Sequence, residues 1–79
     1  MSRKRMWRKI KKSDLYKYVS LQLDCSNGQE IWAGSINSPK HGIKWFKTAE
    51  NERRAALLVD LQLINHKLQP VNILKKHDH

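Results

Sequence analysis

The clearest pattern in the chain is an alternation of apolar and polar residues that runs from position 16 to position 37. Residues 16–24 alternate with aliphatic side chains on one side and polar ones on the other, as in a half-buried strand. In residues 31–37, Trp32, Gly34 and Ile36 alternate with Ile31, Ala33 and Ser35, which is the signature of a strand with two unlike faces. Asn27-Gly28 lies between the two segments and is a strong hairpin signal, because both residues tolerate positive φ. The pattern predicts an antiparallel hairpin.

A third, shorter strand is expected at residues 43–46, after a turn, and a helix is expected over about residues 49–67. Thr48 is the expected cap of this helix, with Glu50 in its first turn, where a carboxylate suits the helix dipole. The predicted fold class is therefore α+β, with a three-stranded antiparallel sheet packed on one C-terminal α-helix. Such a sheet needs a cover on its apolar face, and the helix is the expected cover.

The predicted helix carries two apolar stripes at helical spacing. The first is expected to face the sheet: Ala55, Ala56, Leu58, Val59 and Leu63. Its expected partners in the sheet are Val19, Leu21, Trp32, Ile36 and Phe46. The second stripe lies on the opposite side: Leu57, Leu61, Ile64 and Leu68. The sequence leaves three covers open for it, which are Val71, Ile73 and Leu74 folding back, Met6, Trp7 and Ile10, or a second copy or partner protein.

Positive charge is concentrated at the start of the chain. The net charge is +9, and seven basic residues with no acid stand among the first twelve positions: Arg3, Lys4, Arg5, Arg8, Lys9, Lys11 and Lys12. We therefore expect a flexible basic arm at residues 1–14, a single domain at residues 15–74 and a disordered tail at residues 75–79. A basic arm on a nearly neutral domain favours nucleic-acid binding, because each neutralised phosphate releases counterions. A solubilising tail and contact with an anionic membrane surface are the alternatives.

The catalytic and metal-binding candidates in the sequence are weak. Cys25 and His41 both fall in predicted turns, with no third group to orient the histidine. The terminal His77-Asp78-His79 offers two histidines, which do not make a closed tetrahedral metal site. No apolar run is long enough to cross a bilayer. We expect a binding protein that is not an enzyme and has no cofactor, metal, membrane or small-molecule substrate. The single cysteine favours a reducing compartment, either bacterial or phage-infected cytoplasm or a nucleus.

Three motifs follow one another along the predicted domain: W-A-G-S-I, I-K-W-F-K-T-A-E and R-A-A-L-L-V-D. With these motifs and the later Asn72, the chain resembles the DNA-binding domain of the APETALA/ethylene-response-factor family. This domain also occurs in phage and bacterial proteins. The matching residues are Trp32, Gly34, Ile36, Phe46, Thr48, Glu50, Ala55, Ala56, Asp60 and Asn72. The resemblance covers about residues 15–73 and implies that the outer sheet face enters the major groove of duplex DNA. The chain is also similar to the arm-site-binding domain of tyrosine recombinases.

We therefore interpret the chain as a small double-stranded DNA-binding protein that regulates transcription or recombination. The arm would follow the backbone, and side chains of the exposed outer sheet face would meet base edges or phosphates. These are Lys17, Ser20, Gln22, Ser35, Asn37, Lys40 and Lys44. The alternative is a protein-interaction module, such as a phage-type inhibitor of a host protein or a homodimer, that uses the second stripe. RNA binding is a further hypothesis, with Trp7, Tyr16 and Tyr18 as stacking candidates.

Overall fold

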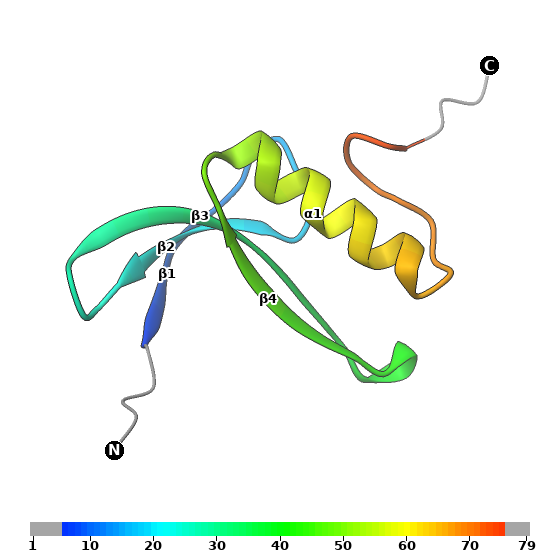
Figure 1. Cartoon of the computed structure of the whole chain (residues 1–79), viewed down its shortest axis with the longest axis horizontal. Helices are drawn as coiled ribbons and strands as arrows, with labels where there is room; N and C mark the ends of the chain where they lie inside the picture. Colours follow the sequence, from blue (N-terminus) through cyan, green and yellow to red (C-terminus); the bar gives the residue numbers. More distant parts are fainter. Residues whose placement is uncertain (1–5, 76–79) are drawn as a thin grey trace.

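A computed structural model describes residues 6–75 as a four-stranded antiparallel sheet with one helix packed on it (Figure 1). The strands lie in the sheet in chain order: β1 (Trp7–Lys12), β2 (Val19–Asp24), β3 (Gln29–Ser38) and β4 (Ile43–Ala49). A short 3₁₀ helix, η1 (Pro39–His41), joins β3 to β4, and the helix α1 (Glu52–Asn65) follows. The expected α+β class, with an antiparallel sheet and one C-terminal helix, is confirmed, but the expected count of three strands is wrong.

The additional strand consists of residues that the charge pattern assigned to a flexible arm. β1 pairs antiparallel with β2, and the register shifts between Lys9 and Lys11, as at a bulge. Residues 7–12 therefore belong to the sheet, at its edge, where lysine is common because its charge discourages pairing with another chain. Residues 1–5 of the predicted arm, with Arg3, Lys4 and Arg5, and residues 76–79 of the predicted tail lie outside the described residues.

The hairpin predicted at Asn27-Gly28 is confirmed. β2 and β3 pair antiparallel, and Gly28 adopts a φ of 74° in the turn between them. Asp24 closes the turn from its strand end. Its carbonyl accepts a hydrogen bond from the Gly28 N–H at 2.7 Å, and its carboxylate accepts one from the Ser26 N–H at 3.0 Å.

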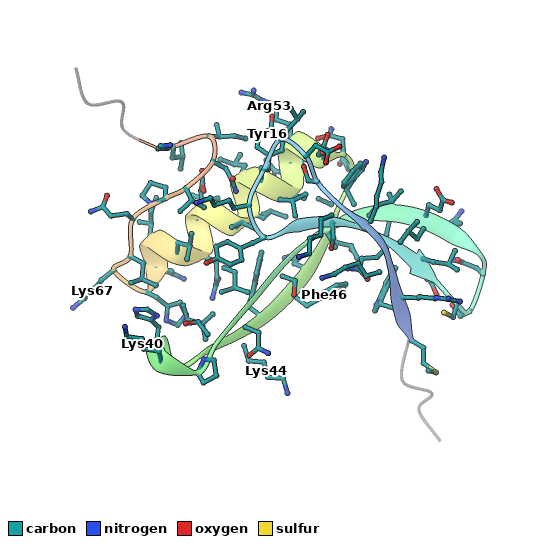
Figure 2. All side chains as sticks on the ribbon, turned by 180° about the vertical axis from the view of Figure 1, so that it is seen from behind. Tyr16, Lys40, Lys44, Phe46, Arg53 and Lys67 are labelled. Carbon is teal, nitrogen blue, oxygen red and sulfur yellow. The ribbon has the colours of Figure 1, made fainter. Side chains whose placement is uncertain are left out.

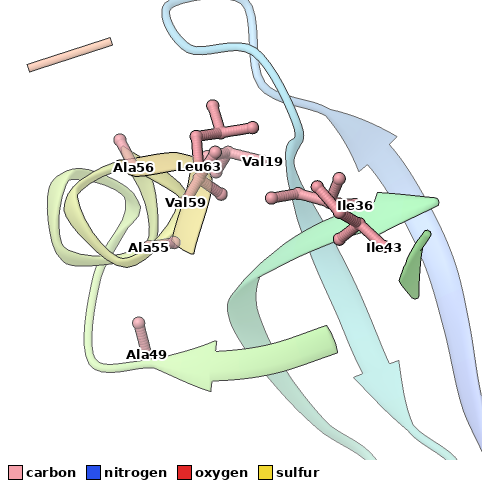
Figure 3. Close-up of a cluster of buried hydrophobic side chains, with 8 residues drawn as sticks. All are labelled: Val19, Ile36, Ile43, Ala49, Ala55, Ala56, Val59 and Leu63. Carbon is pink, nitrogen blue, oxygen red and sulfur yellow. The ribbon is translucent and has the colours of Figure 1, made fainter. Parts of the chain in front are cut away.

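One face of the sheet carries α1 and the hydrophobic core (Figure 3). The core consists of Val19, Ile36, Ile43, Ala49, Ala55, Ala56, Val59 and Leu63. Four of the five residues of the first helical stripe are thus buried as predicted, and Leu58 packs beside them. Gly34 lies under the helix, and a Cβ built on it would be 2.6 Å from Val59 Cγ2. Glycine therefore permits a close approach of helix and sheet.

Phe46 does not belong to this core, contrary to the prediction. In the pairing of β3 with β4, Trp45 lies opposite Ile36 and Phe46 lies opposite Ser35. Side chains alternate between the faces of a strand, so a difference of one position reverses the face. Trp45 packs against the core, and Phe46 is exposed on the other face of the sheet.

α1 begins later than expected because β4 is longer than expected. Thr48 still pairs within the sheet, opposite Ala33, and cannot cap a helix. The N-cap is Asn51, whose side-chain oxygen accepts a hydrogen bond from the Arg54 N–H at 2.7 Å. Glu52 is the acidic residue of the first turn. The predicted helix is confirmed, but its cap is not.

A buried carboxylate in the helix anchors the chain segment that returns along α1 (Figure 1). Asp60 is fully buried and accepts hydrogen bonds from three backbone N–H groups: Val71 at 3.1 Å, Asn72 at 3.0 Å and Leu74 at 2.8 Å. The Asn72 side chain in turn bonds both backbone groups of Lys17, at 2.7 and 3.0 Å. The returning segment thereby joins the helix to the loop before β2.

This segment packs against the hydrophobic core, together with Leu68 of the second helical stripe. Of the residues expected to fold back, Val71 and Ile73 pack against the core and Leu74 stays exposed, so the return of the chain is confirmed in part. Leu61 and Ile64 keep 49% and 45% of their surface exposed. The other intramolecular cover considered, by Met6, Trp7 and Ile10, does not occur, because Met6 and Ile10 are exposed and Trp7 contacts Phe46.

Candidate nucleic-acid interface

The face of the sheet away from α1 is strongly coiled. Trp7 and Phe46 stand on the two edge strands, β1 and β4, yet their ring centroids are 5.7 Å apart. In a flat sheet these strands would lie about 14 Å apart, because neighbouring strands are about 4.8 Å apart. The twist of the sheet brings the start of β1 and the middle of β4 together across this face. The face is therefore a trough that is bridged by two aromatic rings.

Two of the residues expected to read bases lie beneath this bridge. Gln22 on β2 and Ala33 on β3 lie between Trp7 and Phe46 in the strand pairing. Ser20 lies next to them on β2, opposite Ala33. Ser20 is 4% exposed and Gln22 is 5% exposed, and the Gln22 Nε2 donates a hydrogen bond to Ser20 Oγ at 2.6 Å. The expectation that these two side chains face solvent is wrong, because the sheet coils over them. The two side chains therefore form a hydrogen bond with each other inside the fold.

The other predicted contact residues are accessible wherever the structure describes them: Arg8, Lys9, Lys11, Lys12, Lys17, Ser35, Asn37, Lys40 and Lys44. In β1, the register places Lys9 and Lys12 on the coiled face, opposite Gln22 and Ser20. Arg8 and Lys11 lie on the helix side, where the Lys11 Nζ is 5.9 Å from the Trp32 ring centroid. β1 therefore presents positive charge on both sides of the sheet edge.

A hollow of about 520 Å³ separates β1 from the loop that leads into β2. Its main lining residues are Lys9, Lys12, Lys17, Tyr16, Tyr18 and Ser35. None of the described residues that line it is acidic. Ser13, also in the lining, donates its hydroxyl hydrogen to the Glu52 carboxylate. Three lysines that line a concave surface give it a positive potential, which attracts anions.

A second hollow of about 410 Å³ continues from the first along β3. Ser35 lines both, and Asn37, Lys44 and Phe46 line only the second. Figure 2 shows Phe46 and Lys44 along β4, with Lys40 in the turn that precedes the strand. The structure thus brings together most of the accessible predicted contacts on the coiled face. Lys40, Arg8 and Lys11 stand apart from the hollows.

The aromatic lining is the part of this surface that the DNA hypothesis missed. The sequence offers Tyr16 and Tyr18 only as stacking candidates for RNA, and it gives no sign of the contact between Trp7 and Phe46. The sequence does hold a signal, because tyrosines at 16 and 18 flank Lys17 directly. The sequence does not predict the position of β1, which supplies Lys9 and Lys12 to the lining of the hollow.

The weak catalytic pair of the sequence is not assembled. Cys25 lies in the turn before β3 and His41 lies after its other end, so the ten-residue strand separates them. His41 Nδ1 instead lies 2.9 Å from Ser38 Oγ. Within residues 6–75, no three side chains of the metal-ligating types stand together. Among the helices of that same range, none has the length and apolar character needed to cross a membrane.

No protein-family model, curated protein or solved structure matches this chain.

Proposed function

We propose that this chain is a double-stranded DNA-binding protein that holds the duplex with β1 and the cationic hollow beside it. One observation carries the proposal: Lys9, Lys12 and Lys17 converge on a single hollow, and no described acidic residue lines it. Each phosphate that such a group neutralises releases condensed counterions, and this release supplies most of the affinity for DNA. The resemblance of residues 15–73 to the APETALA/ethylene-response-factor domain supports the same function.

The proposal divides the surface into phosphate contacts and base contacts. Lysines of β1 and Lys17 contact the backbone and fix the register of the protein on the duplex. Asn37 and Lys44 lie opposite each other in the register and project from the coiled face beyond the aromatic bridge. Asparagine pairs with adenine and lysine with guanine in the major groove, so this pair is the proposed base-reading element. A regulator of transcription or recombination is the role that suits such a protein.

The phosphate role of β1 is tested by the double variant Lys9→Gln/Lys12→Gln. Its affinity for a mixed-sequence duplex is expected to fall about thirtyfold, with the slope of log K against log salt reduced by about two, because each lost contact removes about 0.9 from that slope. The measurement is fluorescence anisotropy at several salt concentrations.

The matched control is Arg53→Gln/Arg54→Gln, which removes the same charge from exposed positions of α1. Its salt slope is expected to stay within about 0.5 of the parent value, because these arginines make no phosphate contact in the proposal. Equal losses in both variants would show that net charge acts without a defined site. An unchanged slope in the β1 variant would remove the phosphate role of β1.

A second candidate function is protein interaction through Leu61 and Ile64. These two apolar residues are about half exposed on successive turns of α1, so a protein partner that covers this side of the helix would bury both. The Leu61→Glu variant is expected to keep its free energy of unfolding within about 0.5 kcal/mol, since the position is on the surface. Sedimentation velocity at high protein concentration then separates the cases. If the parent self-associates and the Leu61→Glu variant does not, the result supports an interface at these residues. If the parent stays monomeric, the result excludes a homodimer.

A further inference from the structure

Tyr18 has an unusual backbone conformation at the edge of the cationic hollow. Its φ is 63°, in the left-handed region that bulky residues rarely adopt. Its carbonyl accepts a hydrogen bond from the Ser35 N–H at 2.9 Å, which fixes the residue against β3. The side chain is nevertheless 51% exposed. A glycine would fit this conformation without strain, so the tyrosine ring is not explained by the fold alone. Strain that the surrounding structure maintains is often found at binding sites.

The hollow beside Tyr18 combines the two chemical features that a nucleotide requires. Lys9, Lys12 and Lys17 supply ammonium groups for a phosphate, and the exposed ring of Tyr18 supplies a flat face for a base. Tyr16 packs against the hydrophobic core and forms a fixed wall. The volume of about 520 Å³ lies within the range of sites that hold small organic ligands, roughly 300 to 1,000 Å³.

We infer that this hollow accepts one unpaired nucleotide of the bound DNA, with its base against Tyr18 and its phosphate between the lysines. The inference rests on the proposed function, because the nucleotide belongs to the strand that β1 holds. A base inside an intact stack does not reach a concave site of this kind. Extruding it costs free energy, and this cost is smallest for a base that has no pairing partner. The protein should therefore prefer a duplex that contains one unpaired nucleotide.

The test compares a fully paired duplex with the same duplex carrying one unpaired adenine, by anisotropy at a single salt concentration. The parent protein is expected to bind the duplex with the unpaired adenine about tenfold more tightly, because stacking of one base on an aromatic ring contributes about that much. Tyr18→Gly is expected to abolish this preference while its unfolding temperature stays equal or rises, because glycine relieves the backbone strain. Tyr18→Phe keeps the ring and is expected to keep the preference.

Lys67→Gly is the matched control for relief of strain. Lys67 is a second non-glycine residue with positive φ, at 61°, and it follows the end of α1 rather than lining the hollow. This variant is expected to retain the preference for the unpaired nucleotide. Equal affinity of the parent for the two duplexes overturns the inference and leaves the proposed function standing. A preference that survives in Tyr18→Gly also overturns it. Failure to bind either duplex overturns the proposed function together with the inference.

Discussion

Replacing Asp60 with alanine is expected to lower the free energy of unfolding by about 4 kcal/mol, the largest loss that we expect from one side chain in this fold. The carboxylate is fully buried and accepts hydrogen bonds from the N–H groups of Val71, Asn72 and Leu74. A hydrogen bond to a charged group contributes about 1.5 to 3 kcal/mol, and a buried donor left without an acceptor carries a desolvation cost as well. Urea denaturation followed by tryptophan fluorescence measures the loss.

Asp60→Asn is the graded control for this anchor. Its carbonyl oxygen replaces Oδ1, which accepts from Val71 and Asn72, but its amide group cannot accept from the Leu74 N–H. The expected loss is about 2 kcal/mol. An alanine variant within 1 kcal/mol of the parent would contradict the docking of the returning segment. The anchor also bears on the interface, because Asn72 holds the backbone of Lys17, a lining residue of the hollow.

Gly34→Ala is expected to cost about 3 kcal/mol, at the upper end of the usual range for an overpacked core. The added Cβ would lie 2.6 Å from Val59 Cγ2 and 2.9 Å from Trp45 Cζ3. One contact comes from the helix and the other from β4, so relief requires the helix to rise or the indole to move. The free energy of unfolding is measured by urea denaturation.

A double-mutant cycle with Val59→Ala separates steric overlap from other effects of the methyl group. Val59→Ala removes the atom at 2.6 Å, so Gly34→Ala should cost less in that background, by at least about 1 kcal/mol. A Gly34→Ala variant as stable as the parent would mean that α1 does not lie this close to β3. Equal costs in both backgrounds would assign the strain to Trp45 instead.

The hairpin and the helix could be predicted because their signals are local. Asn27-Gly28 fits a tight turn, and the alternation in residues 19–24 and 31–37 identifies the faces of two strands. β1 could not be predicted in this way. Its residues are mostly basic, and such a composition is typical of an unfolded arm. The register shift between Lys9 and Lys11 also interrupts the alternation that would indicate a strand. The strand forms because β2 offers an unpaired edge, which is a property of the sheet rather than of residues 7–12.

The two faces of β4 show a second limit of pattern analysis. Trp45 and Phe46 are adjacent and both aromatic, so the period of the strand does not decide which of them meets the helix. Pairing with β3 decides it, because Ile36 is buried and lies opposite Trp45. The burial of Gln22 follows from coiling of the whole sheet, which no local pattern records.

The candidate interface was predictable in its charges but not in its shape. Lys9, Lys12 and Lys17 stand out in the sequence as basic residues, yet a hollow between them exists only because β1 folds beside the loop before β2. Asp60 and Asn72 appear in the sequence only as matches to a family motif. Their role as an anchor emerges from hydrogen bonds that join residues far apart in the chain.

The most direct measurement for the central claim is a titration of a fully paired DNA duplex into isotope-labelled protein, with backbone amide shifts recorded at two salt concentrations. DNA binding by β1 and the coiled face predicts the largest shifts at residues 8–12, 16–18, 35–37 and 44, with smaller shifts at the higher salt concentration. Leu61, Ile64 and Asn65, which are exposed on α1, should change little. Shifts confined to α1, or no shifts at a saturating DNA concentration, would contradict the claim that this surface binds DNA.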